Sequence, residues 1–186
     1  MDVTITEHKF SLRSTYEISG PELDLMAQRA FFSIPSMTEL KTRAGEVVAT
    51  IHGHVALMTH YTFEFADGRN YDFHTEKFWK SVFACSREGE ETYTYYQHHG
   101  LKASVFQGDG QQDRQIAALT KNAFVIGNGN EYDIRMNHDA DAVVIACMVL
   151  AMNTADDDDK QNSTFNIDFG SIGPQDRAFD EAWVPT

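Results

Sequence analysis

Apolar and polar side chains alternate along most of the chain, and Gly, Asp and Asn interrupt the alternation about every ten residues. Strict alternation predicts strands with one buried face, because neighbouring side chains of a strand point to opposite sides. Residues 54–74 show the pattern best, since aromatic residues alternate with polar ones on both sides of Asp67-Gly68, a dipeptide that favours a hairpin turn. This segment predicts a β-hairpin.

The same signals recur before and after this hairpin. Arg43-Ala44-Gly45 marks a second turn between two short segments of strand character. The further predicted strands are residues 15–18, 24–32, 39–42, 46–51, 79–87, 92–98, 102–107, 116–119, 124–126 and 131–136. About eleven or twelve short strands at regular spacing predict a barrel or a sandwich, and closure into a barrel removes exposed sheet edges.

The pattern changes after Met136. Asn137 or Asp139 can cap a helix start, and an unbroken apolar run follows over residues 142–152. A helix that is apolar on all sides has no face to offer to water. Residues 139–154 span roughly 24 Å as a helix, whereas a bilayer crossing takes about twenty apolar residues. The sequence therefore predicts a mainly β fold, an antiparallel closed barrel of about twelve strands around one buried helix near the C-terminus.

A polar tail follows the predicted helix and opens with four consecutive acids, Asp156 to Asp159. Negative charge at the C-terminal end of a helix opposes the helix dipole, so we expect the chain to leave the core here. The run lacks the spaced ligands and the Gly of a calcium loop, which favours simple solvation. We therefore predict one barrel domain over residues 1–155, with its helix at 139–154, and an acidic tail over 156–186 that packs on the outside.

Charge limits the partners that this chain can have. The net charge is −13, and the 15 Lys and Arg residues are scattered along the sequence. Nucleic acids and anionic membranes both require clustered basic residues, so we expect no nucleic-acid binding and at most a peripheral membrane association. The first residues have neither a basic start nor an apolar run, which favours the cytoplasm. Cys85 and Cys147 lie in apolar surroundings typical of packed free thiols, although a disulfide stays open.

Two parts of the chain resemble a known family. The first part is a strand-to-helix segment, residues 132–136 followed by 141–146, which is similar to the final strand and central helix of LURP-one-related proteins. The second part is the pair of hairpin segments 43–48 and 65–69, which resemble turns of the same proteins. LURP-one-related proteins belong to the tubby-like and phospholipid-scramblase-like superfamily. The resemblance covers roughly residues 10–159 and implies a twelve-stranded barrel around one hydrophobic helix. The basic pocket with which tubby domains bind phosphoinositides has no counterpart here. The acidic run follows the helix, whereas the calcium-binding segment of scramblases precedes it.

Histidines supply the main candidates for chemistry, and the chain has eight of them. His52 and His54 are two residues apart on a predicted strand and should share one face. His60, with Asp72 and His74 across the hairpin, could supply the third ligand of a metal site, and an imidazole beside a carboxylate is also how general bases are oriented. The alternative is a polar, solvated sheet face, which we favour because exposed strand faces are ordinarily polar.

Two functions follow from these observations. The first is a non-enzymatic binding or regulatory domain of the LURP-one-related kind, without metal or cofactor, which engages a protein partner or a small amphiphile at the barrel surface or rim. The second is a small enzyme of the isomerase or cyclase type, with His and Asp or Glu side chains at a cavity between helix and barrel wall. Its candidate catalytic residues are His52, His54, His74 and Asp72.

Overall fold

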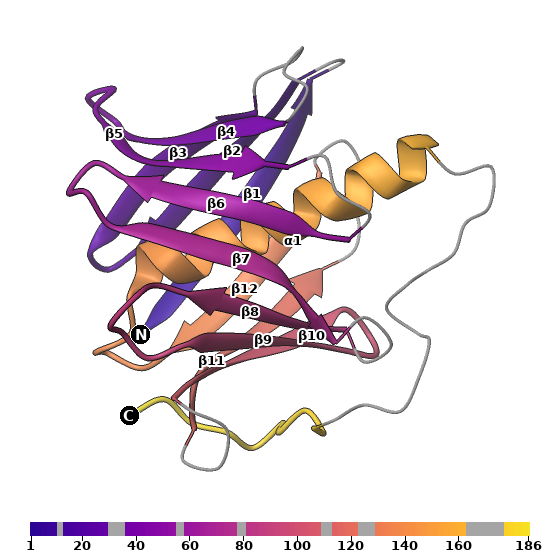
Figure 1. Cartoon of the computed structure of the whole chain (residues 1–186). Helices are drawn as coiled ribbons and strands as arrows, with labels where there is room; N and C mark the ends of the chain where they lie inside the picture. The colour runs from indigo at the N-terminus through magenta and orange to yellow at the C-terminus, as the bar shows by residue number, and fades with distance from the viewer. Residues whose placement is uncertain are drawn as a thin grey trace.

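The computed structural model describes residues 1–10, 13–29, 36–54, 58–77, 81–108, 113–122, 129–162 and 177–186. Within these ranges the chain forms a closed antiparallel barrel of twelve strands and one helix, α1 (Ala142–Asn162) (Figure 1). The strands are β1 (Asp2–Phe10), β2 (Arg13–Gly20), β3 (Leu23–Arg29), β4 (Met37–Thr42), β5 (Val47–Gly53), β6 (His60–Phe65), β7 (Asn70–Lys77), β8 (Val82–Ser86), β9 (Tyr93–His98), β10 (Lys102–Gln107), β11 (Arg114–Asn122) and β12 (Glu131–Met136). The predicted fold class is confirmed.

Each strand pairs with the strand that follows it, and β12 returns to pair with β1. At this seam Ile5 lies opposite Tyr132 on β12, while on its other side Ile5 lies opposite Ile18 on β2. Because the last strand pairs with the first, the sheet has no unpaired edge at which another chain could add a strand.

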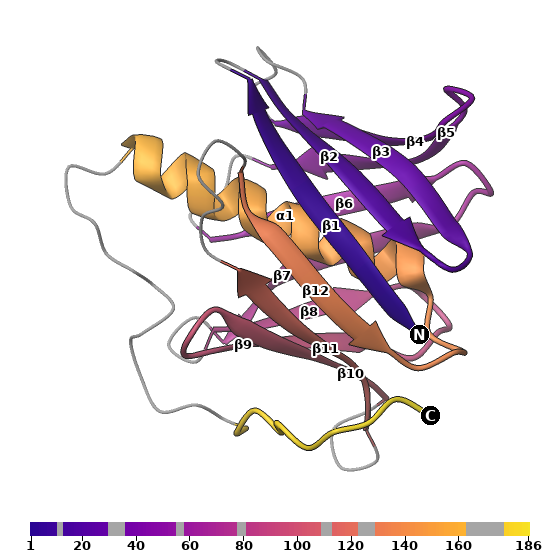
Figure 2. The same cartoon turned by 180° about the vertical axis from the view of Figure 1, so that it is seen from behind.

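Helix α1 fills the barrel. Strands lie in front of it in Figure 1, where β6 and β7 cross it, and also in the reverse view of Figure 2, where β1 and β12 cross it. Every residue from Val144 to Ala151 is at most 1% exposed, so the whole circumference of this part of the helix is packed. Within the part of the chain that the structure describes, no helix is both long and apolar enough to cross a membrane.

The helix is longer than predicted, and both of its predicted ends are wrong. It begins at Ala142 instead of residue 139, because Asp141 provides the cap: its Oδ1 accepts hydrogen bonds from the backbone N–H groups of Val143 (3.0 Å) and Val144 (3.1 Å). It continues to Asn162 and includes the acidic run that was expected to follow it. Extending an existing helix adds one hydrogen bond for each residue fixed, which offsets the poor helix propensity of aspartate.

Strand β1 was not predicted from the sequence. Val3 and Ile5 alternate with threonines as a strand should, but the next inward position is Glu7, which is 0% exposed. A carboxylate at a core position breaks the pattern on which the prediction depends. The strand predicted at residues 124–126 lies outside the described residues.

Both cysteines are free thiols in the packed interior, each 0% exposed, Cys85 on β8 and Cys147 on α1. Burial raises the pKa of both thiols far above the ordinary cysteine range, because a thiolate there would lose its hydration. We expect neither thiol to react with a disulfide reagent such as DTNB at pH 8 in the native protein, and both to react in denaturant.

A comparison of the Cys85→Ser and Cys147→Ser variants assigns each reaction. The Cys147 thiol should react only as fast as the whole protein unfolds, because it lies inside the barrel. Native-state labelling of Cys147 within minutes, under conditions where unfolding takes hours, would contradict a filled lumen.

Candidate functional site

The predicted histidines lie on the outer face of the barrel, on and beside three neighbouring strands. On β5, His52 alternates with the buried residues Ile51 and Gly53, and His54 follows the strand on the same face. His60 on β6 and His74 on β7 also occupy outward positions. The candidate residues of the enzyme hypothesis therefore lie on the outer surface of the barrel and do not line a space between barrel wall and helix. They point outward because the alternate, inward positions of these strands carry apolar side chains.

Asp72 joins two of these histidines. Its Oδ1 lies 2.7 Å from His60 Nε2, and its Oδ2 lies 2.6 Å from His74 Nδ1. The pairing of β6 with β7 sets this geometry, because His60 lies directly opposite His74, and Thr62 lies directly opposite Asp72. All four side chains consequently project from one side of the hairpin.

His54 extends the group from the neighbouring strand. Its ring stacks on the ring of His60, with centroids 4.4 Å apart, and its Nε2 lies 2.6 Å from Thr62 Oγ1. We call His54, His60, Thr62, Asp72 and His74 the histidine cluster. Side chains linked in this way lose little further rotamer entropy on binding, so the cluster is a preorganised surface.

His52 does not belong to this cluster. Its Nε2 lies 3.3 Å from Glu64 Oε2, an ion-pair distance without hydrogen-bond alignment. His52 and His54 thus share a face but have different partners, so the two-histidine site suggested by their spacing does not form.

The protonation of Asp72 follows from its neighbours. Partial burial raises the pKa of Asp72, but the hydrogen bonds from His60 and His74 outweigh this effect, and the net pKa lies below the ordinary aspartate range. The stabilisation that Asp72 gives is present above the pKa it has in the unfolded chain, and it is lost as the pH falls through the lower pKa of the folded state. At neutral pH Asp72 is a carboxylate that can only accept hydrogen bonds.

This charge state fixes which ring nitrogens carry protons. Because a carboxylate donates nothing, His60 donates from Nε2 and His74 donates from Nδ1. In the neutral ring the other nitrogen, Nδ1 of His60 or Nε2 of His74, is an acceptor. Among the described residues no group of three His, Cys, Asp or Glu side chains is arranged to hold a metal ion. With neutral rings, the cluster therefore presents hydrogen-bond acceptors.

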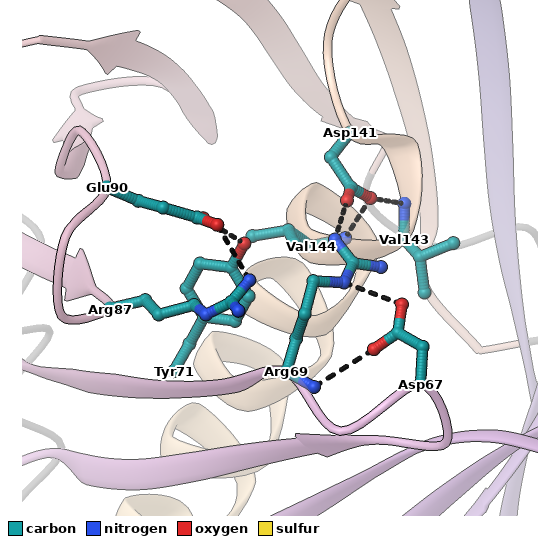
Figure 3. Close-up of polar contacts among 8 residues, drawn as sticks. All are labelled: Asp67, Arg69, Tyr71, Arg87, Glu90, Asp141, Val143 and Val144. Carbon is teal, nitrogen blue, oxygen red and sulfur yellow. Dashed lines mark hydrogen bonds and ion pairs between the residues drawn. The ribbon is translucent and has the colours of Figure 1, made fainter.

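A second polar group lies where α1 begins, and sequence reasoning missed it (Figure 3). Besides capping the helix, Asp141 binds Arg69 Nη1 through its other oxygen. Arg69 comes from the β6–β7 hairpin, where its Nε also donates to Asp67 Oδ2 at 2.7 Å. The signal for this site was the position of Asp141 directly before the apolar run, two residues beyond the predicted cap.

The neighbouring β8–β9 turn joins the same group. Tyr71 donates its hydroxyl hydrogen to Glu90 Oε2 (2.9 Å), and Arg87 Nη1 donates to Glu90 Oε1 (2.7 Å). The guanidinium of Arg69 lies over the Phe65 ring, 4.6 Å from its centroid. The charges drawn in Figure 3 have partners of opposite charge. Arg69 attaches the β6–β7 turn to the start of the helix, and Glu90 attaches the β8–β9 turn to Tyr71 on β7.

A third polar group lies in the barrel interior, further along the helix, and is centred on Asn153, which is 1% exposed. Asn153 Oδ1 accepts hydrogen bonds from Asn130 Nδ2 (3.1 Å) and from the Tyr132 hydroxyl (2.5 Å). Asn153 Nδ2 donates to Tyr16 Oη (2.9 Å). Asn130 also donates from its side chain to Glu7 Oε2, at 2.8 Å. The network connects α1 to the seam between β1 and β12, and its polar atoms are satisfied by one another, as buried polar atoms must be.

Comparison of the chain with protein-family models, with curated proteins and with solved structures finds no match. The resemblance to LURP-one-related proteins therefore stays a prediction, and the three polar groups are interpreted from their own geometry.

The cap identified here differs from the predicted one, so the two aspartates can be compared directly. Replacing Asp141 by Ala removes two hydrogen bonds to the helix N-terminus and one partner of Arg69, and we expect unfolding to become easier by about 1–3 kcal/mol. Asp139 forms only an exposed ion pair with Arg114 among the described residues, so Asp139→Ala is the matched control and should leave stability unchanged. Denaturant unfolding measures both; equal effects would contradict the assignment of the cap.

A second experiment tests the electrostatics of the histidine cluster. Replacing both His60 and His74 by Ala removes the hydrogen bonds that lower the pKa of Asp72, whereas partial burial continues to raise it. The pKa of Asp72, followed by carboxyl NMR during an acid titration, should then rise to the ordinary range or above. An unchanged pKa would mean that the two imidazoles do not donate to Asp72.

Proposed function

We propose that the chain is a non-enzymatic binding domain of the LURP-one-related kind, and that it recognises a basic segment of a protein partner on the outer face of β5–β7. The observation that carries this proposal is the histidine cluster, in which Asp72 orients two partly exposed imidazoles on one surface. A barrel of twelve strands around one apolar helix, with the hairpin and strand-to-helix segments named above, supports the family.

The chemistry of the cluster favours a partner that donates hydrogen bonds. Asp72 accepts only, and the ring nitrogens that do not face Asp72, Nδ1 of His60 and Nε2 of His74, accept hydrogen bonds when the rings are neutral. Glu64, whose side chain is 60% exposed, adds a carboxylate beside His52 on the same face. Lys and Arg side chains carry donors and no acceptors, so they complement this surface.

Long-range electrostatics favour the same partner. A net charge of −13 attracts a cationic segment and accelerates its encounter with the protein, and the attraction weakens as salt is added. The filled lumen supports recognition at the surface, because the side chains of α1 occupy the space in which an internal ligand would lie.

The enzyme alternative has less support. General acid–base catalysis works best where water is excluded, and the side chains of Asp72 and His74 are 48% and 41% exposed on an outer face.

Selection of peptides displayed on phage tests the proposed function. We expect peptides selected on the wild-type protein to be rich in Arg and Lys, and to bind more weakly as salt rises. The triple variant His60→Ala, Asp72→Ala, His74→Ala should lower their affinity by about tenfold or more, because each lost charged contact contributes about 1.5–3 kcal/mol.

The matched control is a second histidine–acid pair on an outer face. His8 Nε2 lies 3.5 Å from Glu17 Oε2, on β1 and β2, and the double variant His8→Ala, Glu17→Ala should bind the same peptides as the wild type does. Peptides without basic residues, or an equal loss of affinity in both variants, would refute the β5–β7 surface as the binding site.

A further inference from the structure

The outer face of β9 and β10 differs from that of β5–β7, because its side chains are buried. The outward residues Phe106 (8% exposed), His98 (4%) and Ser104 (1%) are nearly as inaccessible as the barrel core. The His98 ring is fixed by a hydrogen-bond contact of its Nε2 with Ser104 Oγ at 2.7 Å. A sheet face with this burial has something packed on it.

Residues 177–186, which form neither helix nor strand, lie along this side of the barrel (Figures 1 and 2). Arg177 makes the tightest contact. Its guanidinium lies 3.8 Å from the centroid of the Phe106 ring and 5.2 Å from that of Tyr96, and its Nη2 donates to both carboxylate oxygens of Asp113, at 3.1 and 3.0 Å. The Asp113 side chain is only 9% exposed and that of Arg177 is 34% exposed, so the acid in this ion pair is well shielded from water.

Two more side chains of the segment, Phe179 and Glu181, contact side chains on the same face. The Phe179 ring meets the His98 ring edge-on, with centroids 5.4 Å apart, and Lys102 Nζ lies 5.2 Å from the Phe179 centroid. Lys102 also pairs with Glu181. An arginine, an aromatic ring and an acid at alternate positions of the segment thus each contact a complementary group on this face.

Residues 177–181 are attached through their side chains, whereas the end of the segment is attached through its backbone. Thr186 N donates to Asn137 Oδ1 at 2.9 Å, and Thr186 O accepts from His138 N at 3.1 Å. Recognition of alternate side chains by separate receivers is how domains bind extended peptides supplied by other proteins.

We propose that the outer face of β9 and β10, with Asp113, is a peptide-binding groove, and that residues 177–186 are its tethered ligand. The groove accepts a partner segment with the pattern Arg-x-aromatic-x-acid, and that segment replaces the chain's own. The tether raises the local concentration of the internal ligand to the order of millimolar, so the groove is closed until a partner competes. This site is separate from the β5–β7 surface and does not depend on it.

A synthetic peptide with the sequence of residues 177–186 is the probe, labelled with fluorescein and followed by anisotropy. In the double variant Arg177→Ala, Phe179→Ala of the whole 186-residue chain the internal ligand loses two of its three anchors, so the groove is more accessible and the peptide should bind at least tenfold more tightly than to wild type. Adding Asp113→Asn to this variant should abolish the gain, as should a peptide with Ala at the first and third positions. Equal affinity of the peptide for wild type and double variant, or an affinity that the Asp113→Asn substitution leaves unchanged, would overturn the proposal.

A second measurement uses the unaltered chain and so does not depend on the variants folding. The chain has two tryptophans, and Trp183 is in the tethered segment. With fluorotryptophan incorporated, millimolar peptide should move the fluorine NMR signal of Trp183 toward its position in the isolated peptide. A Trp183 signal that stays unchanged at saturating peptide would show that the segment is a fixed part of the fold.

Discussion

The structure depends on one constraint, which is that α1 has no side that water can face. Its residues from Val144 to Ala151 are apolar around the full circumference of the helix, and each is at most 1% exposed. In this chain a sheet that closes on itself covers the helix on every side, and the pairing of β12 with β1 provides that closure. The helix in turn fills a barrel that would otherwise enclose empty space, so we expect each part to depend on the other for its stability.

Apolar packing alone does not fix how far the helix enters the barrel, and two polar groups do so. Asp141 caps the first turn and binds Arg69 of the β6–β7 hairpin, while Asn153 bonds to Tyr132 and Tyr16 on the barrel wall. A shift of the helix along its axis would leave these buried or partly buried groups without partners, which costs more than the contacts contribute when made. With the interior filled and both polar groups engaged, the surface is where the chain can meet other molecules. Two outer faces of the barrel differ in character. The face of β5–β7 carries the histidine cluster, whereas the face of β9 and β10 carries buried aromatic and polar side chains that contact residues 177–186.

The sequence predicts the features that depend on repeated patterns, and it fails at single residues. Alternation along the strands and the uniform apolar run of α1 are statistical signals over many positions, and they are sufficient for the barrel, its antiparallel order and the buried helix. The alternation fails to predict β1 because one carboxylate, Glu7, stands at an inward position, and its partner Asn130 is remote in sequence. Spacing placed His52 and His54 on one face, but only the pairing of β6 with β7 brings His60, Asp72 and His74 together. The contact of Arg177 with Asp113 has no sequence signal, because nothing in either segment indicates which strand the C-terminal residues cover.

Amide hydrogen exchange in the native state tests the mutual dependence of helix and barrel most directly. If the barrel must come apart before α1 meets water, the backbone amides of residues 145–151 will exchange only through global unfolding, with a free energy of opening equal to the free energy of unfolding from denaturant titration. The innermost amides of β1 and β12 should give the same value, since the seam opens in the same event. Exchange of the helix amides at a clearly lower free energy, while the strands stay protected, would show that α1 can leave a barrel that stands without it.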